Sequence, residues 1–220
     1  MERVLPASFL FRYALPVLHR DPIQPGKSGP RPLPPECRLP DVAGLDAGTP
    51  FAELRLAWND AGLAVSLEVT GKAHPPQGDP NAPAESDGLQ LWIDTRKTQN
   101  IHRAGRFCHH FCILPQVAGR RKDRPRAIQL PIARAREDAP LVESKALPVN
   151  AQPRTDGYRL DAWLPAAVLN GYDPDSAPRL GFYYCVRDSE LGDQTLSVGA
   201  EFPYAHDPSL WATLELVRDG

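Results

Sequence analysis

The sequence lacks a long apolar run and an excess of charge of either sign. Its one apolar segment near the start is interrupted by Arg12 and His19, so no stretch of the 220 residues approaches the roughly 20 apolar residues of a membrane-spanning helix. The 25 Lys and Arg against 27 Asp and Glu give a net charge of −2 at pH 7. We therefore expect neither a chain that crosses a bilayer nor a basic protein that binds nucleic acid through its overall charge.

Cysteine is scarce, and the N-terminal segment lacks the features of an export signal. Arg12 and two prolines lie inside its apolar stretch, and no small-residue cleavage site follows them. In an exported protein the four cysteines could form two disulfides, but without an export signal we predict a cytoplasmic protein whose thiols are reduced and buried. The four are Cys37, Cys108, Cys112 and Cys185.

Motifs of the common enzyme sites are also missing. No glycine-rich phosphate loop is present, and Ser86 and Ser197 lack the sharp glycine-flanked turn of a nucleophilic serine. Several aspartates could in principle pair for glycoside hydrolysis, but no spacing selects a pair. We predict that the protein is not an enzyme and carries no cofactor.

Residues 108–112, Cys-His-His-Phe-Cys, have the composition of a metal-binding motif. On a strand, however, Cys108 and Cys112 lie about 13 Å apart, too far to bind one zinc ion through Zn–S bonds of about 2.3 Å. A site across neighbouring strands, built from Cys108, His110 and Cys185, stays open as an alternative. The prediction is no metal, with buried thiols and a hydrogen-bonded histidine.

Proline is abundant instead, and it shapes the expected organisation. The chain has 25 prolines and 16 glycines, which favours loops and strands over long helices. Seven of the prolines lie in residues 21–40, so we predict a proline-rich N-terminal arm over residues 1–40 that packs on the surface. Residues 41–220 are predicted to form one domain.

Apolar and polar residues alternate in short runs from residue 53 onward, which is the pattern of half-buried strands. The runs are residues 54–58, 63–69, 89–94, 106–113, 126–133, 158–164, 180–187 and 210–217. Turn residues separate them, and one short helical piece is expected at residues 165–171. The pattern predicts an all-β protein, a two-sheet antiparallel β-sandwich that carries the N-terminal arm.

Five segments of this region, taken in order, resemble the family 9 carbohydrate-binding modules, a branch of the wider DOMON-like group of β-sandwiches. The segments are residues 54–69, 86–96, 156–169, 180–188 and 207–216. The resemblance implies a two-sheet sandwich whose known members bind sugar chains without cleaving them. Some DOMON-like relatives hold haem through methionine and histidine, but the one methionine here is Met1, which excludes that ligation.

The residues that bind sugar in the family are replaced at most matching positions. Two tryptophans clamp the terminal sugar in members attached to xylanases, and the matching positions here are Ala84 and Ala205. The family's carboxylate falls at Gln90, and its arginine and glutamine from two other strands fall at Cys108 and Cys185. Tyr204 and His206 flank the second clamp position and could take its place.

Strand alternation nevertheless groups a set of aromatic and polar residues on one face. If Leu89, Leu91 and Ile93 point into the core, Gln90 and Trp92 point to the opposite side. Extended to the neighbouring strands, this rule places Gln90, Trp92, Arg106, His110, Tyr183 and Arg187 on one face. Together with Tyr204 and His206, which the resemblance puts beside the second clamp position, they form the predicted ligand-binding face. Trp92 and Tyr204 would stack on a sugar ring, and Gln90, Arg106, Arg187 and His206 would make the polar contacts.

Two functions therefore stay open at this stage. The first is a non-catalytic binding module for a carbohydrate on that face. The alternative is an intracellular protein-interaction or structural β-sandwich without a sugar site, in which the arm or a loop covers the face and Trp92 belongs to a second core layer. A basic stretch has two interpretations: a solvated loop between strands, or a docking site for an acidic partner. It contains Arg120, Arg121, Lys122, Arg124 and Arg126.

Overall fold

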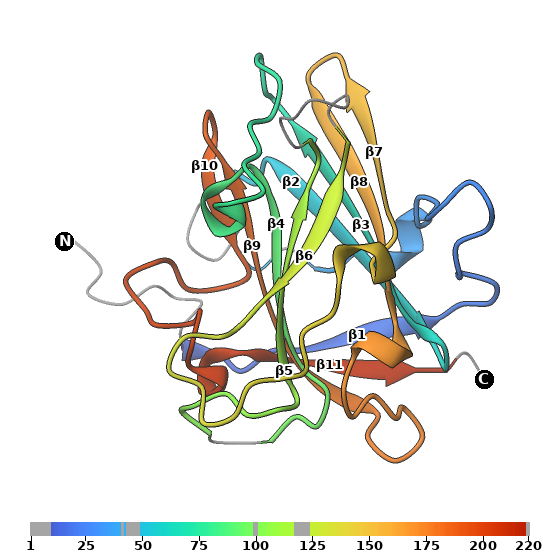
Figure 1. The fold of residues 1–220 in the computed structure, drawn as a ribbon, viewed down its shortest axis with the longest axis vertical. Coiled ribbons are helices and arrows are strands. Elements are labelled where there is room, and N and C mark those ends of the chain that lie inside the picture. Colours follow the sequence, from blue (N-terminus) through green and yellow to red (C-terminus); the bar gives the residue numbers. More distant parts are fainter. Residues whose placement is uncertain (1–9, 41, 43–48, 99–100, 117–123, 219–220) are drawn as a thin grey trace.

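The computed structural model describes residues 10–40, 42, 49–98, 101–116 and 124–218, and these residues form an all-β fold (Figure 1). The strands are β1 (Ala14–His19), β2 (Ala52–Asn59), β3 (Gly62–Thr70), β4 (Gly88–Asp94), β5 (Cys108–Leu114), β6 (Arg126–Leu130), β7 (Val149–Arg154), β8 (Gly157–Pro165), β9 (Arg179–Asp188), β10 (Gly192–Thr195) and β11 (Ala212–Val217). The helical pieces are the short 3-10 turns η2 (Pro35–Cys37), η4 (Pro83–Glu85), η5 (Ser144–Ala146), η6 (Ala166–Val168) and η7 (Pro208–Leu210). Among these residues, no helix has the length and apolar character of a membrane span.

The strands form one continuous mixed sheet that folds over a single core. Their order is β6-β5-β4-β9-β11-β1-β2-β3-β8-β7, with β10 added beside β9. Strand β1 runs parallel to both of its neighbours, β11 and β2, and the other pairs are antiparallel. Inward side chains from both halves of the sheet share one hydrophobic core. The all-β prediction is confirmed, but the two predicted sheets are joined because β1 lies between them.

The predicted hairpin is formed by β2 and β3. Leu54 and Leu56 lie opposite Leu67 and Val65, so their side chains share the core face. The turn needs glycine at its end: Gly62 has φ +147°, and a Cβ there would lie 2.2 Å from the carbonyl oxygen of Leu164. The helical piece expected at residues 165–171 is the single turn η6.

Strand β1 lies within the segment expected to be a surface arm, and it is a full member of the sheet instead. Leu15 and Val17 are buried, because β1 pairs with β11 along residues 14–18. Pro16 lacks a backbone N–H and is disfavoured inside a sheet. It is tolerated because the pairing with β2 involves only Leu18 and His19.

The part of the arm that follows β1 packs on the outer face of the half formed by β2, β3 and β8. Leu33 and Cys37 are buried there against Ala57, Ala64 and Trp163. The Leu33 backbone N–H donates to the Ser66 hydroxyl over 2.9 Å. This part of the arm therefore lies on a different part of the sheet from β4, β5 and β9, which carry the predicted ligand-binding face.

Candidate functional site

The structure brings together five of the eight predicted site residues. Strand β4 runs between β5 and β9, and Trp92 lies opposite both His110 and Tyr183. Gln90, two positions earlier on β4, shares their face, and Tyr204 comes from the loop before β11. We call Gln90, Trp92, His110, Tyr183 and Tyr204 the Trp92 cluster.

Ring contacts hold the Trp92 cluster together. The rings of Trp92 and His110 are stacked, with centroids 4.4 Å apart and planes 10° apart. Tyr204 stacks on Tyr183 at 4.5 Å and meets Trp92 edge-on at 5.4 Å. Trp92 and Tyr183 are 2% and 0% exposed, so their faces are filled by protein and closed to a sugar ring.

Two loops close the predicted ligand-binding face. The loop at residues 71–87, which contains η4, presents the Ala84 carbonyl, which accepts hydrogen bonds from Gln90 Nε2 at 3.0 Å and Arg187 at 2.9 Å. The loop at residues 196–211 supplies Tyr204, and its Val198 N–H donates to the Tyr183 hydroxyl at 3.0 Å. The face is therefore a second core layer covered by loops, as in the alternative weighed from sequence.

Burial sets the protonation of the groups in this layer. It lowers the pKa of His110 to about 4, so the imidazole is neutral at pH 7. Since Gln90 uses its amide N–H on Ala84, its Oε1 is the acceptor for His110 Nε2, 3.1 Å away. Burial raises the pKa of Cys112 to about 12 and that of Cys185 to about 11, which leaves both as neutral thiols rather than metal-binding thiolates.

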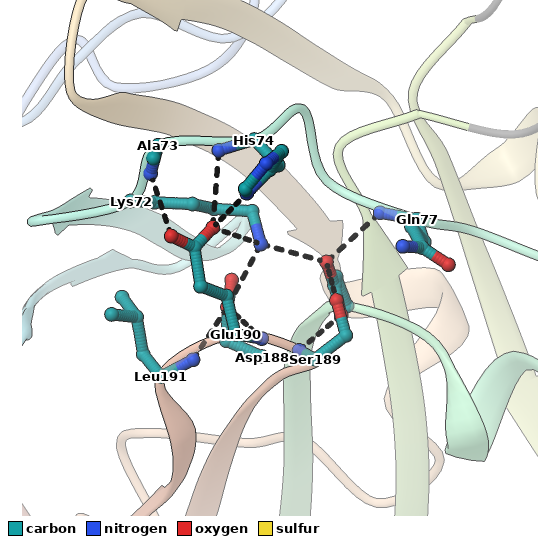
Figure 2. A network of polar contacts seen from close by, with 9 residues as sticks. Lys72, Ala73, His74, Gln77, Asp188, Ser189, Glu190 and Leu191 are labelled. Atoms are coloured by element: carbon teal, nitrogen blue, oxygen red, sulfur yellow. Dashed lines mark hydrogen bonds and ion pairs between the residues drawn. The ribbon is translucent and has the colours of Figure 1, made fainter.

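A buried ion network fixes the loop at residues 71–87 over the face. Figure 2 shows the Lys72 ammonium between the carboxylates of Asp188 and Glu190. Lys72 follows the end of β3, Asp188 is the last residue of β9, and Glu190 comes just after it. Its Nζ lies 2.9 Å from Asp188 Oδ1 and 3.2 Å from Asp87 Oδ2. Asp87 in turn accepts the backbone N–H groups of Gln77 and Ser189. Both ends of the loop are thereby tied to β9.

The other three predicted site residues lie outside the Trp92 cluster. Arg187 is at its edge, engaged with Glu85 and with Asp193 at 2.8 and 3.0 Å. Arg106 is exposed beside the Phe107 ring, because a turn at residues 105–108 ends the strand alternation there. His206 is half-buried in the loop before β11.

The basic stretch falls partly outside the described residues. Arg120, Arg121 and Lys122 lie in the gap at residues 117–123, whereas Arg124 and Arg126 are described and exposed. Its role as a docking site stays a prediction.

A groove of about 640 Å³ is lined in part by the same loop at residues 196–211, and the sequence analysis did not predict it. We call it the His102 groove. Its aromatic lining comes from Phe11, Tyr13, Phe202 and Trp211, and its polar lining includes Arg12, Lys97, His102, Asp207 and Ser209. Phe11 is 58% exposed and presents an open ring, whereas Trp211 is buried and forms part of the wall.

A polar triplet lies in the wall of the His102 groove. His102 Nδ1 lies 3.1 Å from Asp207 Oδ2 and 3.2 Å from Ser209 Oγ. Ser209 Oγ also donates to Asp207 at 2.6 Å. A nucleophilic serine needs the ring nitrogen opposite the one that the aspartate holds. Because serine and aspartate meet the same nitrogen, the triplet orients the imidazole and builds no nucleophile.

Hydrogen bonds also set the charge of Asp207. Partial burial alone would raise its pKa, but the hydrogen bonds from Ser209 and His102 outweigh burial and lower it. The carboxylate is therefore ionised at pH 7 and already bonded within the wall. It was part of the closing Asp-Pro-Ser segment noted in the sequence, but His102 lies 105 residues away, and no local pattern joined the two.

Among the residues that the structure describes, no group of three or more His, Cys, Asp or Glu side chains is arranged to hold a metal ion. Cys108 and Cys112 lie opposite Asp94 and Gln90, at different levels of β4.

Comparison with known proteins identifies solved structures that have a similar fold. No family model matches the sequence, and neither does any curated protein. Among solved structures, a family 9 carbohydrate-binding module from Caldicellulosiruptor kristjanssonii in complex with cellotriose has a TM-score of 0.60 at 15% identity, covering 94% of this chain and 95% of that one. The glucose complex of a family 9 module from the same organism gives 0.59 at 14% identity, covering 94% and 97%.

A third solved structure is a candidate carbohydrate-binding protein from Bacteroides uniformis. Its TM-score is 0.52 at 13% identity, covering 78% of this chain and 80% of that one. At these identities the likeness establishes the fold, and membership of the wider DOMON-like group stays a prediction. The chain has a fold like that of the family 9 carbohydrate-binding modules.

Proposed function

We propose that the protein is a non-catalytic carbohydrate-binding module whose sugar lies in the His102 groove rather than on the Trp92 cluster. The observation that carries the proposal is the lining of this groove, where an exposed aromatic ring stands beside several hydrogen-bonding side chains. Sugar recognition needs both, because a pyranose ring has an apolar face and a rim of hydroxyls. The solved modules that share the fold were found with cellotriose and glucose.

Each part of the groove has a role in this proposal. Phe11 provides the stacking surface at the rim. His102, held by Asp207 and Ser209, presents its ring Nε2 for a sugar hydroxyl, since no other described residue bonds to that nitrogen. Ser209 and Asp207 contact the same ring nitrogen of His102, Nδ1, so the triplet lacks the geometry that activates a nucleophilic serine. This supports a binding role for the triplet.

Isothermal titration calorimetry against soluble neutral and acidic oligosaccharides tests the proposal. We expect saturable heat from at least one sugar. Phe11→Ala should weaken that binding about 2- to 12-fold, which corresponds to the loss of about 0.5–1.5 kcal/mol of stacking. Leu141→Ala is the matched control, because Leu141 is also 58% exposed and does not line the groove.

The proposal fails if no sugar in the panel gives heat, or if Phe11→Ala binds as wild type does. Trp92→Ala does not serve as a control, because removing a buried indole would disturb the fold.

The predicted cytoplasmic location stays a prediction, which cell fractionation would test.

A further inference from the structure

The His102 groove has more positive than negative charge available to a ligand. Arg12 and Lys97 line it as cations, and Asp207 is the one carboxylate among the described lining residues. That carboxylate is occupied, because it accepts hydrogen bonds from Ser209 and lies against His102. No hydrogen bond or ion pair joins Arg12 to any other residue that the structure describes.

Lys97 is built into the groove rather than left free on the surface. Its stem packs over Gly181, where a Cβ would come within 3.6 Å of Lys97 Cδ and of the Trp211 ring. Its Nζ donates one hydrogen bond to the Trp211 carbonyl at 3.3 Å. An ammonium has three N–H donors, so donors remain for a ligand.

The backbone at Lys97 supports the same role. Its φ of 44° lies in the left-handed region, which non-glycine residues rarely adopt and which is found often at functional sites. The tight turn at residues 94–98 imposes this conformation, because Asp94 accepts the N–H groups of Arg96 and Thr98. The turn thereby directs a long cationic side chain into the groove.

The two cations also influence each other. Burial lowers the pKa of Lys97, the charge of Asp94 opposes that effect, and the charge of Arg12 adds to it. An anion bound between the two side chains would relieve their repulsion. Carboxylates are the anionic groups common in sugars, and both cations can donate charge-assisted hydrogen bonds to them.

We propose that the His102 groove selects acidic saccharides, with a uronate carboxylate held by Arg12 and Lys97 while the sugar ring contacts Phe11. This inference rests on the proposed carbohydrate-binding function and names the class of sugar. Neutral sugars would bind the same groove more weakly, because the two cations would then have no partner from the ligand.

Calorimetry with matched pairs of sugars tests this selection. Trigalacturonate is compared with its methyl ester, and glucuronate with glucuronamide, because each pair differs in charge and keeps the ring. We expect the acid of a pair to bind about tenfold more tightly at low ionic strength, as for one charge-assisted contact. Added salt should reduce the difference, since the groove is open to solvent.

Variants then assign the preference to named residues. Lys97→Met and Arg12→Gln should each bring the affinity for the acid toward that for its neutral partner. Arg12 is exposed, so its variant tests the idea even if Lys97→Met is unstable. Lys145→Met is the control, because Lys145 is exposed, pairs with Glu143 and lies outside the groove.

The outcomes separate the inference from the proposed function. Equal affinity for the acid and the neutral sugar overturns the selection and leaves carbohydrate binding standing. A preference for the acid that survives in both Lys97→Met and Arg12→Gln also overturns it. No heat from any sugar, neutral or acidic, refutes the proposed function and this inference together.

Discussion

Removing the buried charge of Lys72 should destabilise the protein strongly. The side chain is 1% exposed, and its ammonium lies 2.9 Å from Asp188 and 3.2 Å from Asp87, whose side chains are also buried. Lys72→Met keeps the length of the stem and removes the charge. Two carboxylates then remain buried without a cation, because Glu190 adds only further negative charge at 3.7 Å.

Breaking a buried ion pair by removing one partner costs roughly 3–5 kcal/mol. For a chain of this length, each kcal/mol lowers Tm by about 2–4 °C, so Lys72→Met should melt roughly 6–20 °C below wild type. Differential scanning calorimetry at pH 7 measures the difference. Lys145→Met is the control: its exposed pair with Glu143 should contribute less than about 1 kcal/mol.

The pH dependence gives a second readout. Burial alone would lower the pKa of Lys72, but the hydrogen bond and charge of Asp188 and the charge of Asp87 outweigh it and raise the pKa. A raised folded-state pKa means that the lysine's stabilisation is complete below its unfolded value of about 10.5 and is lost as pH rises above it. The deficit of Lys72→Met should therefore be constant between pH 7 and 9. A variant that melts within about 2 °C of wild type would refute this account of the network.

Two further predictions concern the Trp92 cluster. Burial lowers the pKa of His110 to about 4 against about 6.5 unfolded, so the free energy of unfolding should fall by up to about 3 kcal/mol as pH drops through that window. Urea unfolding at pH 7 and 4.5 should show a smaller fall in His110→Asn, and an equal fall would contradict the assignment. Tyr204→Ala should cost about 3 kcal/mol and shift tryptophan emission to the red, because Trp92 loses its cover. Tyr204→Phe keeps the ring and should do neither.

Alternation along single strands was sufficient to predict most of the sheet. Strands β2, β3, β4, β8 and β9 each have a period-2 pattern whose apolar residues are buried in the structure. β1 was missed because its pairing is parallel and depends on β11 at the far end of the chain. The short strand β10 and the exposed strand β7 have little apolar alternation, so a sequence pattern could not reveal them.

The face shared by Gln90, Trp92, His110 and Tyr183 followed from the same alternation, but its closure did not. Closure by the loops depends on contacts between residues far apart in the sequence, such as Lys72 with Asp188. The alternation of residues along one strand does not reveal such contacts. The His102 groove has the same origin. Its residues come from the segment before β1, the loop after β4 and the loop before β11, which meet only in the folded chain.

The position of β1 has a consequence for biosynthesis. Its residues are synthesised before those of β2 to β10, whereas its long pairing partner, β11, follows all of these strands in the chain. Until β11 is made, the edge of β9 that pairs with it stays open, as a strand edge able to pair with another chain. The sheet therefore closes between β9 and β1 only after residues 212–217 have been made, and a nascent chain stalled before residue 212 would expose the strand edges of β9 and β1 to other chains.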